Sequence, residues 1–324
     1  MRVSKLLWAM AAAGAVALSA QHASAQAWPT KAVKFIVPFT PGSGTDIIAR
    51  AISDRLAQNL AQPVIVENRP GAGGTIGAGV VASSAPDGYT LLIHSSAHTV
   101  NPHIYDKLSF DTMKDFAGVT PLASLPNVLI VPPAKGIKSV KELIAAAKAN
   151  PGKLNYGSAG TGSATHMNAE KFRLMAGFDA VHVPFKGTPE VITEVVTGRL
   201  DYFFAPLVSA LSNIRDGKAL ALAVGTAKRS SMLPEVPTTV EAGVPGSDYT
   251  FWVGLLAPSK ISREIIVKLN QETLKALAAP EIKDRLAKLG AEPMPMSPEQ
   301  FDAYIQDELA ANAKIVKAAG VKAN

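Results

Sequence analysis

Two loops rich in glycine and hydroxyl residues carry the strongest chemical signal in the sequence. The first, residues 38–46, reads PFTPGSGTD, and the second, residues 156–163, reads YGSAGTGS. Each loop follows an apolar, strand-like run and precedes a helical pattern, so its backbone N–H groups stand at a helix N-terminus. Such a place favours an anion, because the helix dipole and the unpaired N–H groups both attract negative charge. For the first loop, an ordinary tight turn remains the alternative.

Further candidate binding residues come from the second loop and from three other strand ends. Ser158, Thr161 and Ser163 offer hydroxyl groups, and Ser163 is also a candidate helix N-cap. Three more candidates are Ser95, which ends a strand expected over residues 89–94, and Phe185 and Lys186 within Val183–Gly187. The alternative for this last segment is a strand end with a solvated lysine. Asp201 opens an aromatic strand and is the one carboxylate that we expect to face a cleft.

Other chemistries find weaker support. Gly71–Gly77 is similar to a dinucleotide-binding fingerprint, but its spacing is off by one residue and no acid follows at about twenty residues. His94, His98 and His103 cluster near one strand end, yet no cysteine or acid stands at ligand spacing, which favours hydrogen-bonded loop histidines over zinc. The sequence contains no G-x-S-x-G nucleophile elbow. We therefore expect neither a cofactor nor a metal.

The N-terminal segment and the net charge of the chain limit where the protein acts and which partners it has. Residues 1–25 are typical of a secretory signal, with Arg2 and Lys5 before an apolar run and Ala23-Ser24-Ala25 at the cleavage site. We expect cleavage near Ala25 and a periplasmic mature protein. The formal charge is +6 and the basic residues are scattered, which disfavours nucleic acid as a partner. No cysteine is present, so disulfides and a cysteine nucleophile are excluded.

Apolar strand-like runs alternate with helical patterns, which predicts an α/β fold with parallel sheets covered by helices. Strands are expected over 33–39 and 63–67, with a helix over 46–60 between them. Three further helices carry start signals, which we interpret as structural only. These signals are Ser139 with Glu142, Thr188 with Pro189, and Ser297 with Gln300.

The length of the chain predicts two lobes. Residues 128–132 and 253–258 are both apolar strands that end in proline, and they are the candidate crossovers between lobes. The first lobe would then comprise residues 26–127 and 251–324, and the second residues 128–250. Two crossings make a hinge, with the ligand site between the lobes.

Taken in order, these motifs resemble the periplasmic receptors of tripartite tricarboxylate transporters, known as Bug proteins. The matching stretches are WPTKAVKFIVPFTPGSGTD, VENRPGAGGTIGA, PDGYTLL, NPGKLNYGSAGTGSATH, VPFKGTPE, LPEVPTTVEAG and FWVGLLAP. They cover nearly the whole mature chain. The resemblance implies a type II periplasmic-binding-protein fold whose two lobes close on a ligand, and delivery of that ligand to a membrane permease.

By position, the resemblance also implies which residues grip a carboxylate, partly through ordered water. These are Phe39, Thr40, Gly42, Ser43, Gly44 and Asp46 in the first lobe, and Ser158, Thr161, Gly162 and Ser163 in the second. Where the family usually has a glycine pair after the proline, this sequence has Gly42-Ser43. A side chain there narrows the pocket or adds a donor, so the identity of the ligand does not carry over.

The expected function is a receptor for a small mono- or dicarboxylate, aromatic acids included, that acts as a monomer with a transporter permease. A membrane sensor kinase is a further candidate partner. The alternative is an exported enzyme that uses His94, His98 or Asp201 as an acid or a base on a carboxylate substrate.

Overall fold

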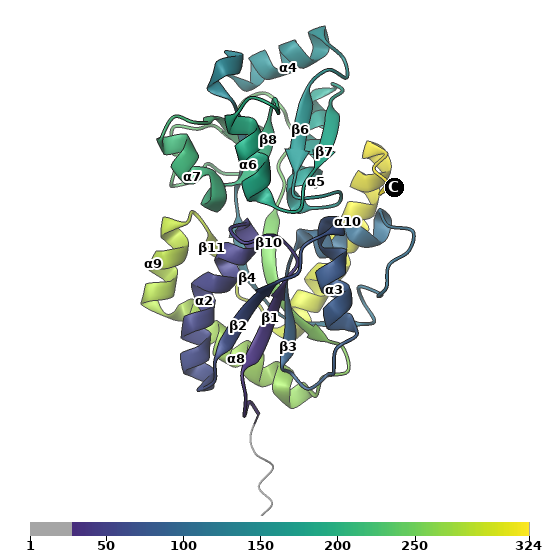
Figure 1. Ribbon diagram of the computed structural model, residues 1–324, viewed down its shortest axis with the longest axis vertical. Helices are drawn as coiled ribbons and strands as arrows, with labels where there is room; N and C mark the ends of the chain where they lie inside the picture. Colours follow the sequence, from purple (N-terminus) through teal and green to yellow (C-terminus); the bar gives the residue numbers. More distant parts are fainter. Residues whose placement is uncertain (1–27, 324) are drawn as a thin grey trace, which may run out of the picture.

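The computed structural model describes residues 28–323, so the expected signal segment and its cleavage site lie outside the described residues. The chain forms two α/β lobes, one above the other in Figure 1. Among residues 28–323, no helix is both long enough and apolar enough to cross a bilayer.

The first lobe is built on a six-stranded sheet with the strand order β11-β4-β10-β3-β1-β2. Its strands are β1 (Val33–Val37), β2 (Val64–Asn68), β3 (Thr90–Ser95), β4 (Phe116–Leu125), β10 (Phe251–Pro258) and β11 (Glu292–Pro293). β1 pairs in parallel with β2 and β3, whereas β10 runs antiparallel to β3 and β4. The sheet is therefore mixed rather than parallel, because β10 enters it from the second lobe and not through a crossover helix.

Helices cover both faces of this sheet. They are α2 (Gly44–Leu60), α3 (Thr75–Ala82), α8 (Arg263–Ala278), α9 (Pro280–Lys288) and α10 (Pro298–Ala319). A hydrophobic core lies on each face of the sheet, and alternate residues of β1 point into one core or the other. Phe35 packs with Ile48 of α2 and Leu269 of α8, while Ile36 packs with Val81 of α3 and Phe301 of α10.

The second lobe holds a three-stranded sheet, β8-β5-β9, and a parallel pair, β6-β7. Its strands are β5 (Asn127–Val131), β6 (Asn155–Ser158), β7 (Val181–Pro184), β8 (Phe203–Pro206) and β9 (Leu220–Val224). An isolated bridge between Tyr156 and Tyr202 joins the edges of the two sheets. The helices are α4 (Val140–Ala149), α5 (Ala164–Ala176), α6 (Thr188–Val196) and α7 (Leu207–Arg215).

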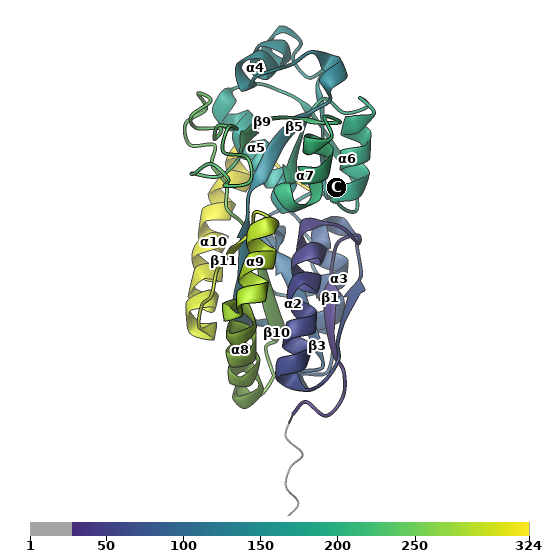
Figure 2. The ribbon, with the colours of Figure 1, turned by 90° about the vertical axis from the view of Figure 1, so that its left-hand side faces the viewer.

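The chain changes lobes at Pro126, between β4 and β5, and returns at the start of β10. Each of the two expected crossover strands thus pairs within one lobe: β5 pairs with β8 and β9, and β10 with β3 and β4. A further connection comes from α10, which packs on β4 and whose last turns reach α5 of the second lobe (Figure 1). Figure 2 shows α10 running along one side of the molecule past the junction of the lobes.

Three expected helix starts are confirmed. Ser139, Ser163 and Ser297 are N-caps whose side chains accept a hydrogen bond from the backbone N–H three residues later. In α10 the capping box is complete, since Gln300 also accepts from the backbone of Ser297.

Candidate ligand site between the lobes

A narrow cavity lies at the interface of the two lobes. Its walls from the first lobe are Phe39, Ser43, Gly44, Thr45, Ser95 and Phe251, and those from the second are Ala159, Ser163, Ala164, Thr165, Thr188 and Pro206. The cavity volume is about 10 Å³, close to the room that one water molecule needs. A carboxylate is larger, so its entry requires the walls to move apart.

The beginnings of four helices meet at this cavity. Gly44 and Thr45 are the first residues of α2, Ala164 and Thr165 of α5, Thr188 of α6, and Pro206 is the N-cap of α7. The first four N–H groups of a helix have no partner within that helix, and the helix dipole makes its N-terminus positive. Among residues 28–323, no charged side chain lines the cavity. Neutral donors and helix dipoles thus supply its positive potential.

The first loop is held in shape by Asp46, whose carboxylate is buried. It accepts hydrogen bonds from Gly42 N at 2.9 Å, from Arg50 Nε at 3.0 Å and from Asn68 Nδ2 at 2.8 Å. Gly42 has φ +82°, in the region that favours glycine. Asp46 itself does not line the cavity. It positions the residues that do.

The second loop is held by two histidines. Ser158 Oγ lies 2.6 Å from His182 Nε2, and the backbone N–H of Gly162 donates to His166 Nδ1 at 3.1 Å. Burial lowers the pKa of His182 to about 4 and that of His166 well below its ordinary value. Both rings are therefore neutral at neutral pH. Only the neutral form of His166 can accept the hydrogen bond from the backbone N–H of Gly162.

Direct contacts join the lobes around the cavity. Thr188 N donates to Ser43 Oγ at 3.2 Å, and Ser209 Oγ donates to Gly42 O at 3.0 Å. On another side, Tyr105 OH donates to Thr161 O at 3.0 Å. The structure is thus a conformation in which the lobes are closed against each other.

The glycine-rich stretch at residues 71–77 takes part in this closure. A Cβ at Gly73 would lie 2.1 Å from Thr161 O, and a Cβ at Gly160 would lie 3.0 Å from Gly73 N. These glycines are needed because two backbones approach each other across the lobe interface. That requirement explains a motif which superficially is similar to a phosphate-binding fingerprint.

The sequence-predicted residues divide into walls, supports and distant groups. Phe39, Ser43, Gly44, Ser95 and Ser163 line the cavity. Thr40, Gly42, Asp46, Ser158, Thr161 and Gly162 belong to the same two loops but do not line the cavity. Phe185, Lys186 and Asp201 do not line it. Asp201 accepts from Asn155 N at 2.7 Å and pairs with Lys135 Nζ at 2.8 Å, so its carboxylate stabilises the second lobe.

Several walls were not predicted. Thr188 was interpreted only as a helix start, and the remaining ones are Thr45, Ala159, Ala164, Thr165, Pro206 and Phe251. The residues next to Ser43 and Ser163 could have been inferred, because they begin the same helices. Nothing in the local sequence marks Phe251 or Pro206, which reach the cavity only through the pairing of their strands.

The histidine cluster does not form a metal site. Among residues 28–323, no group of three His, Cys, Asp or Glu side chains is arranged to hold a metal ion. His94 Nδ1 accepts from Ser95 N at 2.8 Å, and His103 Nε2 lies 2.9 Å from Leu309 O. His98 differs from the expected hydrogen-bonded histidine. Neither of its ring nitrogens has a partner among the described residues, and its ring packs against Phe110 and Phe116.

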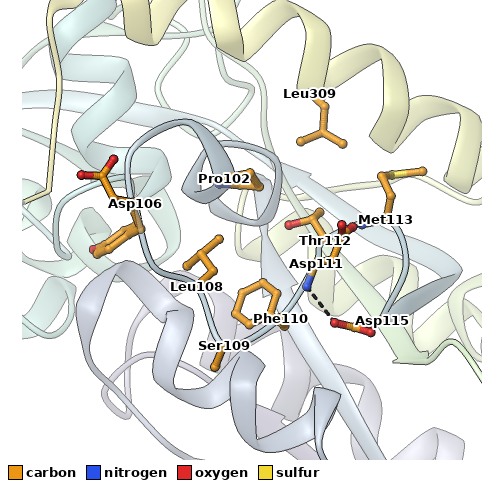
Figure 3. A pocket seen from close by; sticks show the side chains of 11 residues that line it. Pro102, Asp106, Leu108, Ser109, Phe110, Asp111, Thr112, Met113, Asp115 and Leu309 are labelled. Atoms are coloured by element: carbon orange, nitrogen blue, oxygen red, sulfur yellow. Dashed lines mark hydrogen bonds between the residues drawn. The ribbon is translucent and has the colours of Figure 1, made fainter.

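A wider groove of about 590 Å³ lies on the first lobe, between residues 102–115 and Leu309 of α10 (Figure 3). The carboxylates of Asp111 and Asp115 bond to the local backbone. Asp115 accepts from Asp111 N at 2.7 Å, and Asp111 accepts from Met113 N and Lys114 N. These bonds account for Asp111 and Asp115 as turn-forming groups, and none of the residues that line the groove begins one of the α-helices of the described chain.

Two α/β lobes that close on a cavity built of loops and helix N-termini define the class of two-lobed solute-binding proteins. The chain belongs to the tripartite tricarboxylate transporter receptor family, whose model matches residues 48–321. Receptors of this family are periplasmic. The expected family and fold are thereby confirmed.

Individual relatives agree with this assignment. The chain is 34% identical to Protein BugT of Bordetella pertussis over 324 residues, covering 99% of each chain. It is similar to a Rhodopseudomonas palustris protein solved with adipate, at 35% identity and a TM-score of 0.88, covering 91% of this chain and 99% of the other. MatC from the same organism, solved with bound malate, matches with 33% identity and a TM-score of 0.84, covering 89% of this chain and 100% of the other.

Proposed function

We propose that this protein captures a small mono- or dicarboxylate between its lobes and delivers it to the permease of a tripartite tricarboxylate-type transporter. The observation that carries the proposal is the convergence of the α2, α5, α6 and α7 N-termini on one cavity without a charged wall. Two similar proteins were solved with adipate and with malate, which supports a carboxylate as the ligand.

The energetics favour a site that needs both lobes. A micromolar dissociation constant corresponds to about 8 kcal/mol. A hydrogen bond to a charged group contributes about 1.5 to 3 kcal/mol, and ordering the ligand and the lobes subtracts several kcal/mol. The donors of one loop do not supply the binding free energy together with this cost of ordering, whereas the donors of α2 and α5 together do. The ligand therefore favours a state in which both lobes contact it.

The alternative of an exported enzyme finds less support in the site. His98 is buried, burial lowers its pKa to about 3, and it does not line the cavity. Asp201 is engaged within the second lobe. A ligand recovered chemically unchanged from the denatured protein supports the receptor, whereas turnover of that ligand would establish the enzyme.

The test is thermal unfolding of the mature protein with a panel of aliphatic, aromatic and amino-acid carboxylates. A ligand at one hundred times its dissociation constant adds about 2.7 kcal/mol of stability, a shift of a few degrees. Ser163→Ala should abolish the shift. Ser139→Ala is the matched control, because Ser139 caps α4 in the same way and is not a wall of the cavity. Each substitution lowers the free energy of unfolding by about 1 kcal/mol because a helix cap is lost. The two variants should therefore differ only in the thermal shift that the ligand produces.

Delivery to the permease is tested separately, by uptake of the identified acid in cells that contain or lack the receptor. We propose a monomer as the acting form, which sedimentation of the mature protein checks. A sensor kinase as partner would show itself as a response to the ligand that persists when the permease is deleted.

A further inference from the structure

Ser43 occupies the point where the first loop meets helix α6 of the other lobe. Its side chain is 2% exposed. It is the N-cap of α2, yet it makes no capping hydrogen bond to its own helix. Instead, Ser43 Oγ accepts from the backbone N–H of Thr188, the first residue of α6, at 3.2 Å. The protein's own hydroxyl thus takes the amide that α6 would offer to an anion.

The backbone next to this contact leaves no room for a ligand group. A Cβ at Gly187 would lie 2.6 Å from Ser43 Oγ and 1.8 Å from Thr40 Oγ1. The α6 N-terminus therefore rests directly on the first loop. In the closed state a carboxylate cannot enter between Ser43 and Thr188 unless the hydrogen bond between them breaks.

The other helix starts also differ in which N–H groups they leave available to a ligand. Leu207 N, at the beginning of α7, donates to Pro126 O at 2.9 Å. Among the residues that line the cavity, the helix-start N–H groups without a partner are those of Gly44 and Thr45 in α2 and of Ala164 and Thr165 in α5. Much of the remaining wall is apolar, formed by Phe39, Ala159, Pro206 and Phe251. The donors at helix starts that remain thus belong to α2 and α5, whereas the wall beside α7 is apolar.

We propose that Ser43 makes this site selective for ligands with a single carboxylate and a short uncharged remainder. It does so by occupying the α6 amide that a second carboxylate would need. This inference rests on the proposed carboxylate-receptor function, and it narrows that function from mono- and dicarboxylates to monocarboxylates. Ser43 is, in this account, a specificity-determining residue.

The experiment compares acids of equal chain length by titration calorimetry: butyrate with succinate, and hexanoate with adipate. We expect the wild-type protein to bind the monocarboxylate of at least one pair at least tenfold more tightly than its dicarboxylate partner. In Ser43→Gly, the freed amide and the added space should improve dicarboxylate binding relative to monocarboxylate binding by tenfold or more. Glycine is tolerated at a helix N-cap, and the melting temperature of the variant checks its fold.

Ser209→Ala is the matched control. Ser209 Oγ donates to Gly42 O across the same interface, but Ser209 does not line the cavity. Its loss should weaken both acids of a pair by the same factor. If Ser43→Gly also weakens both acids equally, Ser43 is only a closure contact and the inference is overturned. A wild-type preference for the dicarboxylates overturns it as well. If wild-type protein binds no carboxylate of the wider panel, the receptor function itself fails, and the selectivity fails with it.

Discussion

Thr40 Oγ1 donates a hydrogen bond of 3.1 Å to Glu190 Oε2, although the two residues are 150 positions apart and belong to different lobes. Together with the bonds of Ser43 and Ser209, this contact fastens the first loop to α6 and its neighbour α7. Lobe closure in this protein is thus stabilised by its own polar contacts, before any contribution from a ligand.

Removing the Glu190 side chain should weaken ligand binding by favouring the open state. One lost hydrogen bond to a charged group is worth about 1.5 to 3 kcal/mol, which predicts a dissociation constant raised roughly tenfold or more in Glu190→Ala. Glu194→Ala is the control, because Glu194 lies on the same helix and pairs with Arg199 within the second lobe. A tighter complex in Glu190→Ala would contradict the prediction and show that repulsion between Glu190 and an anionic ligand dominates.

Gly73→Ala should prevent full closure. The added Cβ would meet Thr161 O at 2.1 Å, a contact that only separation of the lobes relieves. We expect at least a hundredfold loss of affinity, and a larger radius of gyration in solution scattering with ligand present. Gly136→Ala controls for backbone strain, since Gly136 has φ +70° and no atom within 4 Å of its added Cβ. Equal losses of affinity in both variants would attribute the effect to strain alone.

Asp46→Asn and Asp201→Asn separate a support of the ligand loop from a support of the second lobe. Both substitutions should reduce the free energy of unfolding by about 1 to 3 kcal/mol, because each removes a charged acceptor from backbone and cationic partners. Only Asp46→Asn should also weaken ligand binding, by fivefold or more, since it loosens the turn at Gly42. A comparable loss of affinity in Asp201→Asn would place that carboxylate in the binding mechanism after all.

The protein should lose stability as the pH falls below about 6.5. Burial lowers the pKa of His98 to about 3 and that of His182 to about 4. The unfolded chain, with histidine pKa values near 6.5, therefore takes up protons first. Above pH 6.5 the rings are neutral in both the folded and the unfolded chain, so the free energy of unfolding has its full value. For the buried His98, stability falls by about 1.4 kcal/mol per pH unit until the folded pKa is reached.

His98→Leu tests this directly by urea unfolding at pH 7 and pH 5. The ring nitrogens of His98 have no hydrogen-bond partners among the described residues, so leucine of similar volume should cost little at pH 7. At pH 5 the variant should retain about 2 kcal/mol that the wild type loses. If the free energy of unfolding drops by the same amount from pH 7 to pH 5 in the variant and in the wild type, His98 is protonated in the folded protein or shielded in the unfolded chain.

Features with local physical causes follow from the sequence alone. The N-caps Ser139, Ser163 and Ser297 were identified from a hydroxyl residue ahead of a helical pattern, because a cap is made within four residues. The two loops at helix starts were identified likewise. Walls such as Ser43 and Ser163 lie in them, since the dipole and the free N–H groups of a helix are local properties.

Only the tertiary structure decided which side chains meet. Phe251 reaches the cavity because β10 returns antiparallel beside β3, and Thr188 because α6 docks on the first loop. The same packing keeps Lys186 and Asp201 out of the cavity wall. Gly73 acquires its role only when the lobes close. Such contacts join residues far apart in the chain, and no local pattern encodes them. They depend on how the whole chain buries its surfaces when it folds.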